Sequence, residues 1–206
     1  MLHQYRREPD AVAKRLDELA AVCADNGISH YEGSTAMLRG WVNMTRGRLE
    51  QGLADLRHGL AIHDRSPVGL RKAYYAAMLV EAHLRRGDVD SGLAQIEESL
   101  ARVRNIGDHH WRSELLRLRG ELLSLVPSDS GELAEKAFQE ALACAREQKC
   151  RLLELRAAVS LGRLWAIRGE PQQAQGLVAP IYAEYTEGFD TADLKDARMF
   201  LEEVQQ

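Results

Sequence analysis

Seven histidines and three cysteines are the side chains of this sequence best suited to bind a metal ion or to act as nucleophiles. His109 and His110 are adjacent, so on a helix their rings would point in different directions. His58 and His63 are five residues apart, which misses the i, i+4 spacing that lets two imidazoles on one helix reach the same ion. We therefore interpret the histidines as solvated residues of helix surfaces and predict no metal site.

The spacing of the potential nucleophiles and bases indicates no catalytic set. Cys23, Cys144 and Cys150 are odd in number and lack the CxxC spacing of metal motifs, so we interpret them as reduced, mostly buried small hydrophobes. No serine–histidine–acid or cysteine–histidine set follows from the spacing. The sequence also lacks the GxxxxGKS or GxxxxGKT loop that cradles phosphates. It predicts no catalytic residue and no cofactor, and hence no enzyme.

The charge pattern argues against nucleic-acid and membrane partners. The formal net charge is -4, and the share of hydrophobic residues, 45%, is ordinary for a globular protein. Arg112, Arg117 and Arg119 are interspersed with Glu114 and Glu121, so no basic stripe forms. No apolar run approaches the ~20 residues of a membrane span, and the N-terminus lacks the apolar core of a secretory signal. We expect a cytoplasmic protein.

The elements that position these residues repeat every 40 to 42 residues. The clearest anchors are Val12, Gly52, Gly92, Ala134 and Ala174. Four residues after them lie Leu16, Leu56, Ile96, Phe138 and Val178, and eight residues after them lie Ala20, Leu60, Leu100, Leu142 and Tyr182. Offsets of zero, four and eight share one stripe of a helix, and a fixed period of this size indicates stacked helical hairpins.

Strong helix formers dominate the sequence, and no segment alternates with the period of a strand. We predict helices over residues 9–26, 29–46, 49–64, 67–86, 89–106, 109–125, 130–148, 150–168, 171–187 and 191–205. Gly47, Gly87 and Gly169 each follow a basic helix end and can take the left-handed conformation that stops a helix.

These helices predict a single helical-repeat domain over residues 1–206. Its parts would be an incomplete first hairpin over 1–26, hairpins over 29–64, 67–106, 109–148 and 150–187, and a capping helix over 191–205. The register of Gly40 extrapolates back to just before Met1, so residues 2–5 would be the last turn of a first helix. We therefore expect this chain to be the C-terminal part of a longer protein.

Three stretches carry a resemblance to a known family. They are LRGWVNMTRGRLEQGLADLRHGLA at 38–61, WRSELLRLRGELL at 111–123, and the segment 137–204, which contains TEGFDTADLKDA. Together they resemble the tetratricopeptide-like C-terminal region of large bacterial signalling proteins. Those proteins join a class III nucleotide cyclase-like domain to a signal-transduction-type NTPase and then to transcription-activator-like helical repeats.

The resemblance implies an all-α fold, a tetratricopeptide-like right-handed superhelix of helical hairpins with a period of about 40 residues. Any cyclase or NTPase chemistry of the family would belong to other domains. The implied function is protein interaction: a regulatory arm that binds a partner, or its own NTPase or cyclase domain, through the concave groove.

In tetratricopeptide-like stacks the first helix of each hairpin lines the concave groove. The repeat register then predicts these groove residues: Met37, Trp41, Met44, Tyr74, Glu81, Arg85, Glu114, Arg117, Glu121, Arg156 and Arg163. Met and Trp suit a partner's apolar side chains, and Arg156 and Arg163 suit a carboxylate or phosphate. Replacing both arginines by Glu is then expected to abolish partner binding and leave thermal stability nearly unchanged.

Other interpretations stay open at this point. Trp41 and Met44 would also fit core packing, and Arg156 an ordinary surface ion pair. The groove would otherwise hold a small effector in a pocket lined by Met37, Trp41 and Tyr74. A further alternative is a self-assembly module, a homodimer formed through an exposed N-terminal hairpin. The residues of that apolar flank would be Val12, Leu16 and Leu19.

Overall fold

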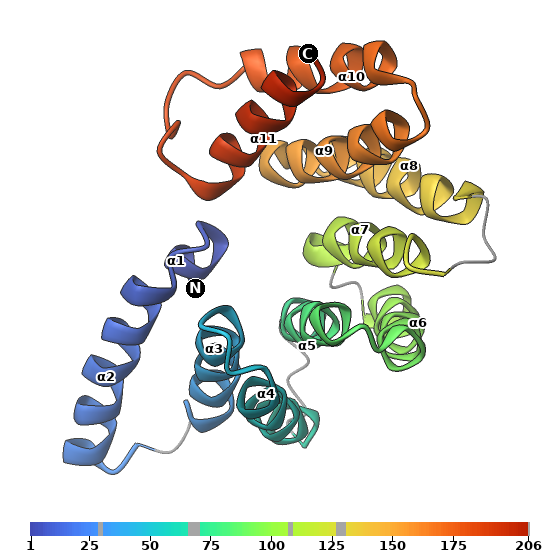
Figure 1. The fold of residues 1–206 in the computed structure, drawn as a ribbon. Helices are drawn as coiled ribbons and strands as arrows, with labels where there is room; N and C mark the ends of the chain where they lie inside the picture. Colours follow the sequence, from blue (N-terminus) through green and yellow to red (C-terminus); the bar gives the residue numbers. More distant parts are fainter. Residues whose placement is uncertain (29–30, 66–70, 107–108, 127–130, 206) are drawn as a thin grey trace. The chain divides into compact units, whose positions relative to one another are not determined.

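The computed structural model describes residues 1–28, 31–65, 71–106, 109–126 and 131–205, and within these ranges it is helical without any strand (Figure 1). The chain divides into two compact units, residues 1–109 and 110–206. The first unit holds α1 (Leu2–Tyr5), α2 (Pro9–Asn26), α3 (Glu32–Thr45), α4 (Leu49–Asp64), α5 (Lys72–Arg86) and α6 (Val89–Ile106). The second holds α7 (Arg112–Leu123), α8 (Glu132–Glu147), α9 (Arg151–Ile167), α10 (Pro171–Ala183) and α11 (Ala192–Glu203). A short 3-10 helix, His109–Trp111, lies at the boundary.

The all-α prediction is confirmed for these residues, and three predicted helices, 9–26, 49–64 and 89–106, have the predicted bounds as α2, α4 and α6. The helix predicted over 67–86 begins at Lys72, and residues 66–70 lie outside the described ranges. The helix predicted over 171–187 ends four residues early, at Ala183. A right-handed superhelix running through a single domain stays a prediction.

The turn inside each hairpin has the same backbone geometry. Gly47, Gly87 and Gly169 adopt the predicted left-handed conformation, with φ of 81°, 75° and 83°. In each turn the glycine N–H donates to the carbonyl three residues back, and the next N–H donates to the carbonyl five residues back. Arg7, which lies 40 residues before Gly47, makes the same bonds with φ of 57°. The repeat therefore extends back to the turn between α1 and α2, as the register predicts.

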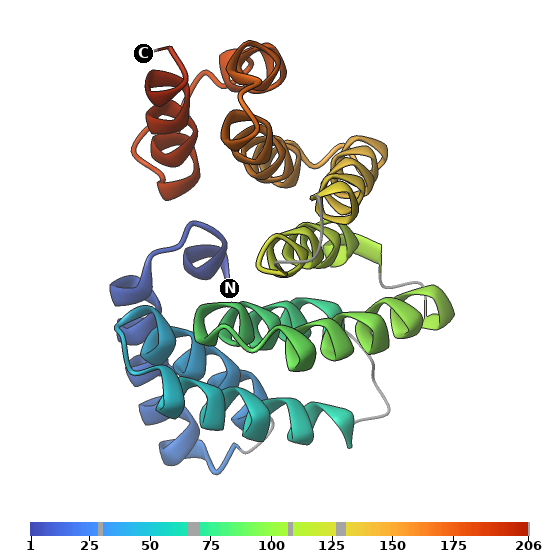
Figure 2. The same cartoon turned by 45° about the vertical axis from the view of Figure 1, so that its right-hand side comes forward.

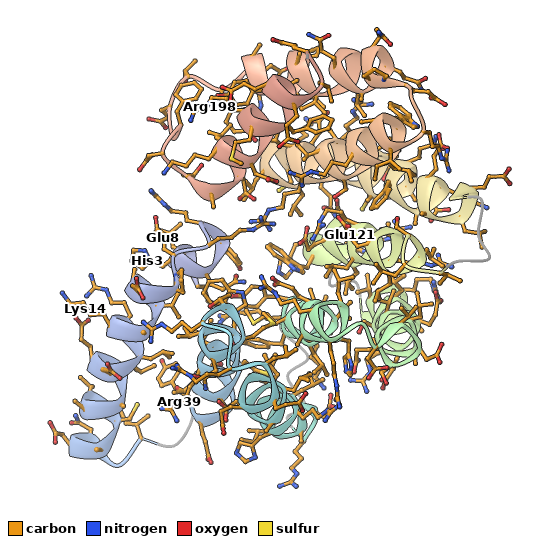
Figure 3. The ribbon with its side chains drawn as sticks, in the orientation of Figure 1. His3, Glu8, Lys14, Arg39, Glu121 and Arg198 are labelled. Carbon is orange, nitrogen blue, oxygen red and sulfur yellow. The ribbon has the colours of Figure 1, made fainter. Side chains whose placement is uncertain are left out.

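Side chains bracket this turn in the first unit. Nδ1 of His3 lies 2.6 Å from Oε2 of Glu8, and the pair is labelled in Figure 3. Forty residues on, Arg48 donates to Oδ1 of Asn43 over 2.8 Å. After another forty, Nδ1 of His83 lies 3.2 Å from Oδ2 of Asp88. We call these three pairs the turn clasps: different side chains bridge the same two repeat positions, so the bridge is preserved where the residue types are not.

Glycines decide how closely α3 and α4 approach, and the two helices lie side by side (Figures 1 and 2). A Cβ atom on Gly40 would lie 2.8 Å from the carbonyl oxygen of Gly52, and one on Gly59 would lie 2.8 Å from that of Gly33. Real Cβ atoms do not approach backbone so closely, because interiors are already close-packed. The small residues of the repeat thus allow backbone contact inside this hairpin.

In the second unit, large aromatic rings cover the glycines of the first helices. Phe138 of α8 packs on Gly120 of α7, and Phe200 of α11 packs on Gly162 of α9. The last helix, α11, lies against both α9 and α10 and buries its apolar side. The buried residues of that side are Leu194, Ala197, Phe200 and Leu201. The segment predicted as a capping helix therefore closes the end of this unit's core.

Candidate functional site

The apolar end of the predicted groove lies inside the core of the first unit. Met37 and Tyr74 are 0% exposed, and Trp41 and Met44 are 2% exposed. The helices of this hairpin meet glycine to glycine, so first-helix side chains reach into the gap: a Cβ atom on Gly59 would lie 2.8 Å from Met37. These four residues are therefore not available to a partner in this structure. For Trp41 and Met44 the alternative of core packing is what the structure shows.

Tyr74 joins α1 to α5 rather than lining a pocket. Its hydroxyl donates to Oε1 of Gln4 over 2.9 Å, and its ring packs edge-on against Tyr5 with centroids 5.2 Å apart. Burial raises the pKa of Tyr74, so the hydroxyl stays protonated as a donor. A small-effector pocket lined by Met37, Trp41 and Tyr74 is thus not formed, because all three side chains fill the packed interior.

The other two predicted groove residues of the first unit lie on the surface of α5. Arg85 Nη2 donates to Oε1 of Glu81 over 2.9 Å, an i, i+4 pair on one helix. Both side chains are partly exposed. Such a pair contributes little to stability, and it leaves the two charges accessible to solvent.

In the second unit, four predicted groove residues come together with two that sequence reasoning missed. Arg117 of α7 donates to both carboxylate oxygens of Glu114, over 2.9 and 3.0 Å, and over 2.8 Å to Glu121. Ser160 of α9 donates to the same Glu121 oxygen over 2.7 Å. Glu121 points from α7 toward α9 (Figure 3). These contacts tie α7 to α9 through polar side chains instead of apolar ones.

Arg156 extends this arrangement to α11. Its Nε and Nη2 donate to the two carboxylate oxygens of Asp193, each over 2.9 Å, and its Nη1 lies 3.7 Å from Oε1 of Glu114. Burial disfavours the charge of Arg156, but the carboxylates of Glu114 and Asp193 outweigh burial and raise the pKa of its guanidinium. We call Glu114, Arg117, Glu121, Arg156, Ser160 and Asp193 the buried charge cluster.

The buried charge cluster corrects the expectation for Arg156. The side chain of Arg156 is 7% exposed and that of Asp193 is 3% exposed, and they form a bidentate pair. Replacing Arg156 by Glu would set two carboxylates against each other away from water, so it would destabilise the fold instead of testing a binding groove. Arg156 holds α9 to α11 and is not offered to a ligand.

Arg163, two helical turns along α9 from Arg156, does lie at the surface. It donates to Asp196 over 2.6 and 3.2 Å, and its side chain is 46% exposed. The guanidinium carbon lies 5.9 Å from the centre of the Phe200 ring, a cation–π arrangement. Arg163 is therefore the one arginine of the predicted pair that a partner can reach.

An apolar groove begins at Arg163 and runs between the ends of α9 and α11. Its volume is about 460 Å³, and we call it the α9–α11 groove. Its lining residues are Arg163, Ala166, Ile167, Pro171, Phe200, Glu203 and Val204. Ile167 is 85% exposed, the highest value among the large hydrophobic residues that the structure describes. The arrangement offers an apolar floor, an exposed aliphatic side chain and an adjacent cation.

The flank expected to form a homodimer is covered. Val12 is 3% exposed and Leu16 is 6% exposed, while Leu19 is partly buried. The N-terminal half of α2 thus already packs within its own unit, because α1 and α3 lie against it. A homodimer through Val12 and Leu16 is not supported.

Neither a metal site nor a membrane span is found in the described ranges. No three His, Cys, Asp or Glu side chains within them gather closely enough to hold an ion. No described helix combines the length and the apolar character that a membrane crossing requires. Cys144 is buried, and burial raises the pKa of its thiol, which opposes thiolate chemistry there.

Comparison with known proteins adds no relative. No protein-family model matches the chain, and no curated protein matches it closely enough to be a relative.

Proposed function

We propose that this chain is a non-catalytic protein-interaction domain whose α9–α11 groove binds a segment of a protein partner. The observation that carries the proposal is Ile167, an aliphatic side chain 85% exposed beside an apolar groove of about 460 Å³. Single exposed apolar residues are common, but an exposed aliphatic residue at the rim of an apolar groove is typical of an interaction surface.

The groove also indicates the chemistry of the partner segment. Its floor, formed by Ala166, Phe200 and Val204, suits an apolar side chain. Arg163 at one end suits a carboxylate, since its present partner, Asp196, is half-exposed and such surface pairs exchange at little cost in free energy. We therefore infer a partner segment with an apolar anchor next to an acidic residue.

A regulatory role completes the proposal. The resemblance of the sequence to the repeat region of bacterial cyclase and NTPase signalling proteins supports a sensor or regulatory arm. Such an arm acts without chemistry of its own, by contacting one state of its target more strongly than another and so shifting their populations. The target would be a partner protein or an NTPase or cyclase domain joined to this chain.

Affinity capture with a matched pair of variants tests the proposal. Wild-type protein, the double variant Ile167→Glu with Arg163→Glu, and Arg15→Glu as a surface control would be immobilised and exposed to source-cell lysate. We expect proteins that bind wild type and Arg15→Glu and are lost from the double variant, as measured by quantitative mass spectrometry. All three side chains are exposed, so circular dichroism should show similar melting temperatures.

Binding that is the same for all three proteins would mean that the groove is not the contact surface. A double variant that no longer folds would show instead that Arg163 or Ile167 has a structural role, contrary to its exposure.

A further inference from the structure

The C-terminal third of α2 is apolar on all sides and largely uncovered. Residues 19–24 read LAAVCA, and Val22 within them is 53% exposed. Ala20, Ala21 and Ala24 are exposed as well. A helix segment that is hydrophobic all round is usually buried against something. This one lies at the surface of its unit.

The repeat shows which element occupies this position in the next hairpin. Adding 40 to Leu19, Val22 and Cys23 gives Gly59, Ile62 and His63 of α4. The start of α3 covers those residues. A Cβ atom on Gly33 would lie 3.0 Å from Cγ2 of Ile62 and 3.2 Å from Nε2 of His63, and the backbone of Gly33 touches Gly59.

The second unit repeats this arrangement. Ala141 of α8 lies seven residues after the anchor Ala134, as Gly59 does after Gly52, and its carbonyl accepts a 2.9 Å hydrogen bond from Ser113 at the start of α7. Ala141 is fully buried. In both hairpins the N-terminal half of the first helix covers the C-terminal third of the second helix.

In the first hairpin the described residues supply only part of such a helix. α1 spans Leu2–Tyr5 and packs against α2, whereas α3 has 14 residues and α9 has 17. In an antiparallel hairpin the end of the first helix lies beside the start of the second. The four residues of α1 therefore cover the start of α2, and Leu19, Val22 and Cys23 keep a position for a helix without one.

We propose that Leu19, Val22 and Cys23, which we call the open hairpin face, bind one amphipathic α-helix of a partner protein. The helix would run antiparallel to α2, in line with α1, and place aliphatic side chains on the face. Continuity with the α1–α2 contact fixes its direction, and the antiparallel alignment of the two helix dipoles favours it. This proposal is independent of the α9–α11 groove, which lies in the other unit.

A peptide from the chain itself is a suitable probe. In the last hairpin the large residue Ile181 takes the repeat position of Leu19, and α9 covers it, so the start of α9 is matched to a bulky partner. An acetylated, fluorescein-labelled peptide of residues 151–162 would be titrated into the full chain while its anisotropy is recorded. We expect saturable binding that Val22→Lys weakens at least about tenfold, as loss of a buried valine contact implies.

Met199→Lys is the matched control, because Met199 and Val22 are equally exposed, at 53%, and Met199 lies on α11. This variant should bind the peptide as wild type does. A second readout is the rate of maleimide alkylation: bound peptide should slow the reaction of Cys23 and leave that of Cys150 unchanged. Both cysteines are partly exposed free thiols.

Two results would overturn the proposal. One is a monomeric protein that shows no saturable peptide binding, or binding that Val22→Lys does not weaken. The other is a dimer in sedimentation equilibrium that Val22→Lys dissociates while the peptide fails to bind, because the occupant would then be a second copy of the chain.

Discussion

Two arginines on α9 show how the environment of a residue, and not its type, decides its role. Arg156 is buried in a bidentate pair with Asp193, while Arg163 forms a half-exposed pair with Asp196. Both pairs join the same two helices, α9 and α11. Away from water, a lost partner leaves an uncompensated charge, whereas at the surface water replaces it. The first pair therefore belongs to the fold and the second is free to serve binding.

Substitution of each arginine should separate the two roles. Arg156→Met is expected to lower the free energy of unfolding by about 3–5 kcal/mol, because Asp193 stays buried without its partner. Arg163→Met should lower it by about 1 kcal/mol or less. Urea unfolding followed by circular dichroism measures both, and equal losses would contradict the difference in burial.

The glycine contact between α3 and α4 permits a second prediction about single residues. Gly40→Ala places a Cβ atom 2.8 Å from the carbonyl oxygen of Gly52, so the helices must separate, at a cost of about 1–3 kcal/mol. Gly176→Ala is the control, since nothing lies within 4 Å of its Cβ position in α10. Alanine there should stabilise the protein by up to about 1 kcal/mol. Thermal melts of the two variants should shift in opposite directions.

Residue roles were less predictable from the sequence than residue positions. The register placed Glu114, Arg117, Glu121 and Arg156 on one face, and the structure brings them together. It could not identify Asp193, because that partner lies 37 residues from Arg156 and depends on how α11 docks. It also could not separate the groove side of α3 from its core side, since glycines in α4 allow α3 to bury more of its surface.

At the scale of elements, the hairpin turn was well predicted because its cause is local. A glycine after a basic helix end needs no tertiary contact to adopt a positive φ, and Gly47, Gly87 and Gly169 all do. Helix ends controlled by packing were predicted less well, as the early end of α10 shows. The turn clasps were missed, since a histidine and an acid five residues apart resemble an ordinary charged surface.

The clasp between His83 and Asp88 makes stability depend on pH. Burial lowers the pKa of His83; the hydrogen bond and charge of Asp88 oppose this shift, and Arg57 and Arg86 add to it. The unfolded chain, with a histidine pKa of about 6.5, then binds the proton more tightly than the folded state. This contribution to stability is present above about pH 6.5 and is lost as the pH falls below it.

His83→Asn tests this dependence, because Asn43 occupies the same repeat position in the preceding hairpin. Urea midpoints at pH 7.5 and 5.5 should fall less for the variant than for wild type. Parallel changes in the two proteins would assign the effect of pH to other groups.

At the scale of the whole molecule, the two proposed surfaces lie in different units. The α9–α11 groove belongs to residues 110–206 and the open hairpin face to residues 1–109. Each can therefore be disabled by substitutions in one unit and assayed against an unchanged other unit. A domain that regulates by contact would gain from two such surfaces, since one can engage a target while the other receives a signal.

The proposed regulatory arm predicts the size of the native protein. An antibody raised against this chain should detect, in source-cell lysate, a band much heavier than 23.1 kDa, because the resembling proteins carry their catalytic domains in the same polypeptide. An immunoblot measures this directly. A band at 23.1 kDa would instead indicate a free-standing adaptor.

The identical backbone bonds in every described hairpin turn have an evolutionary consequence. A unit of 40 residues begins and ends with the same geometry, so a gene segment of that length can be duplicated or deleted in frame and its new neighbours still meet correctly. Arg7 occupies the position of Gly47 and makes the same bonds, which suggests common descent followed by drift at a tolerant site. The length of such a chain is then a heritable variable that selection can adjust one hairpin at a time.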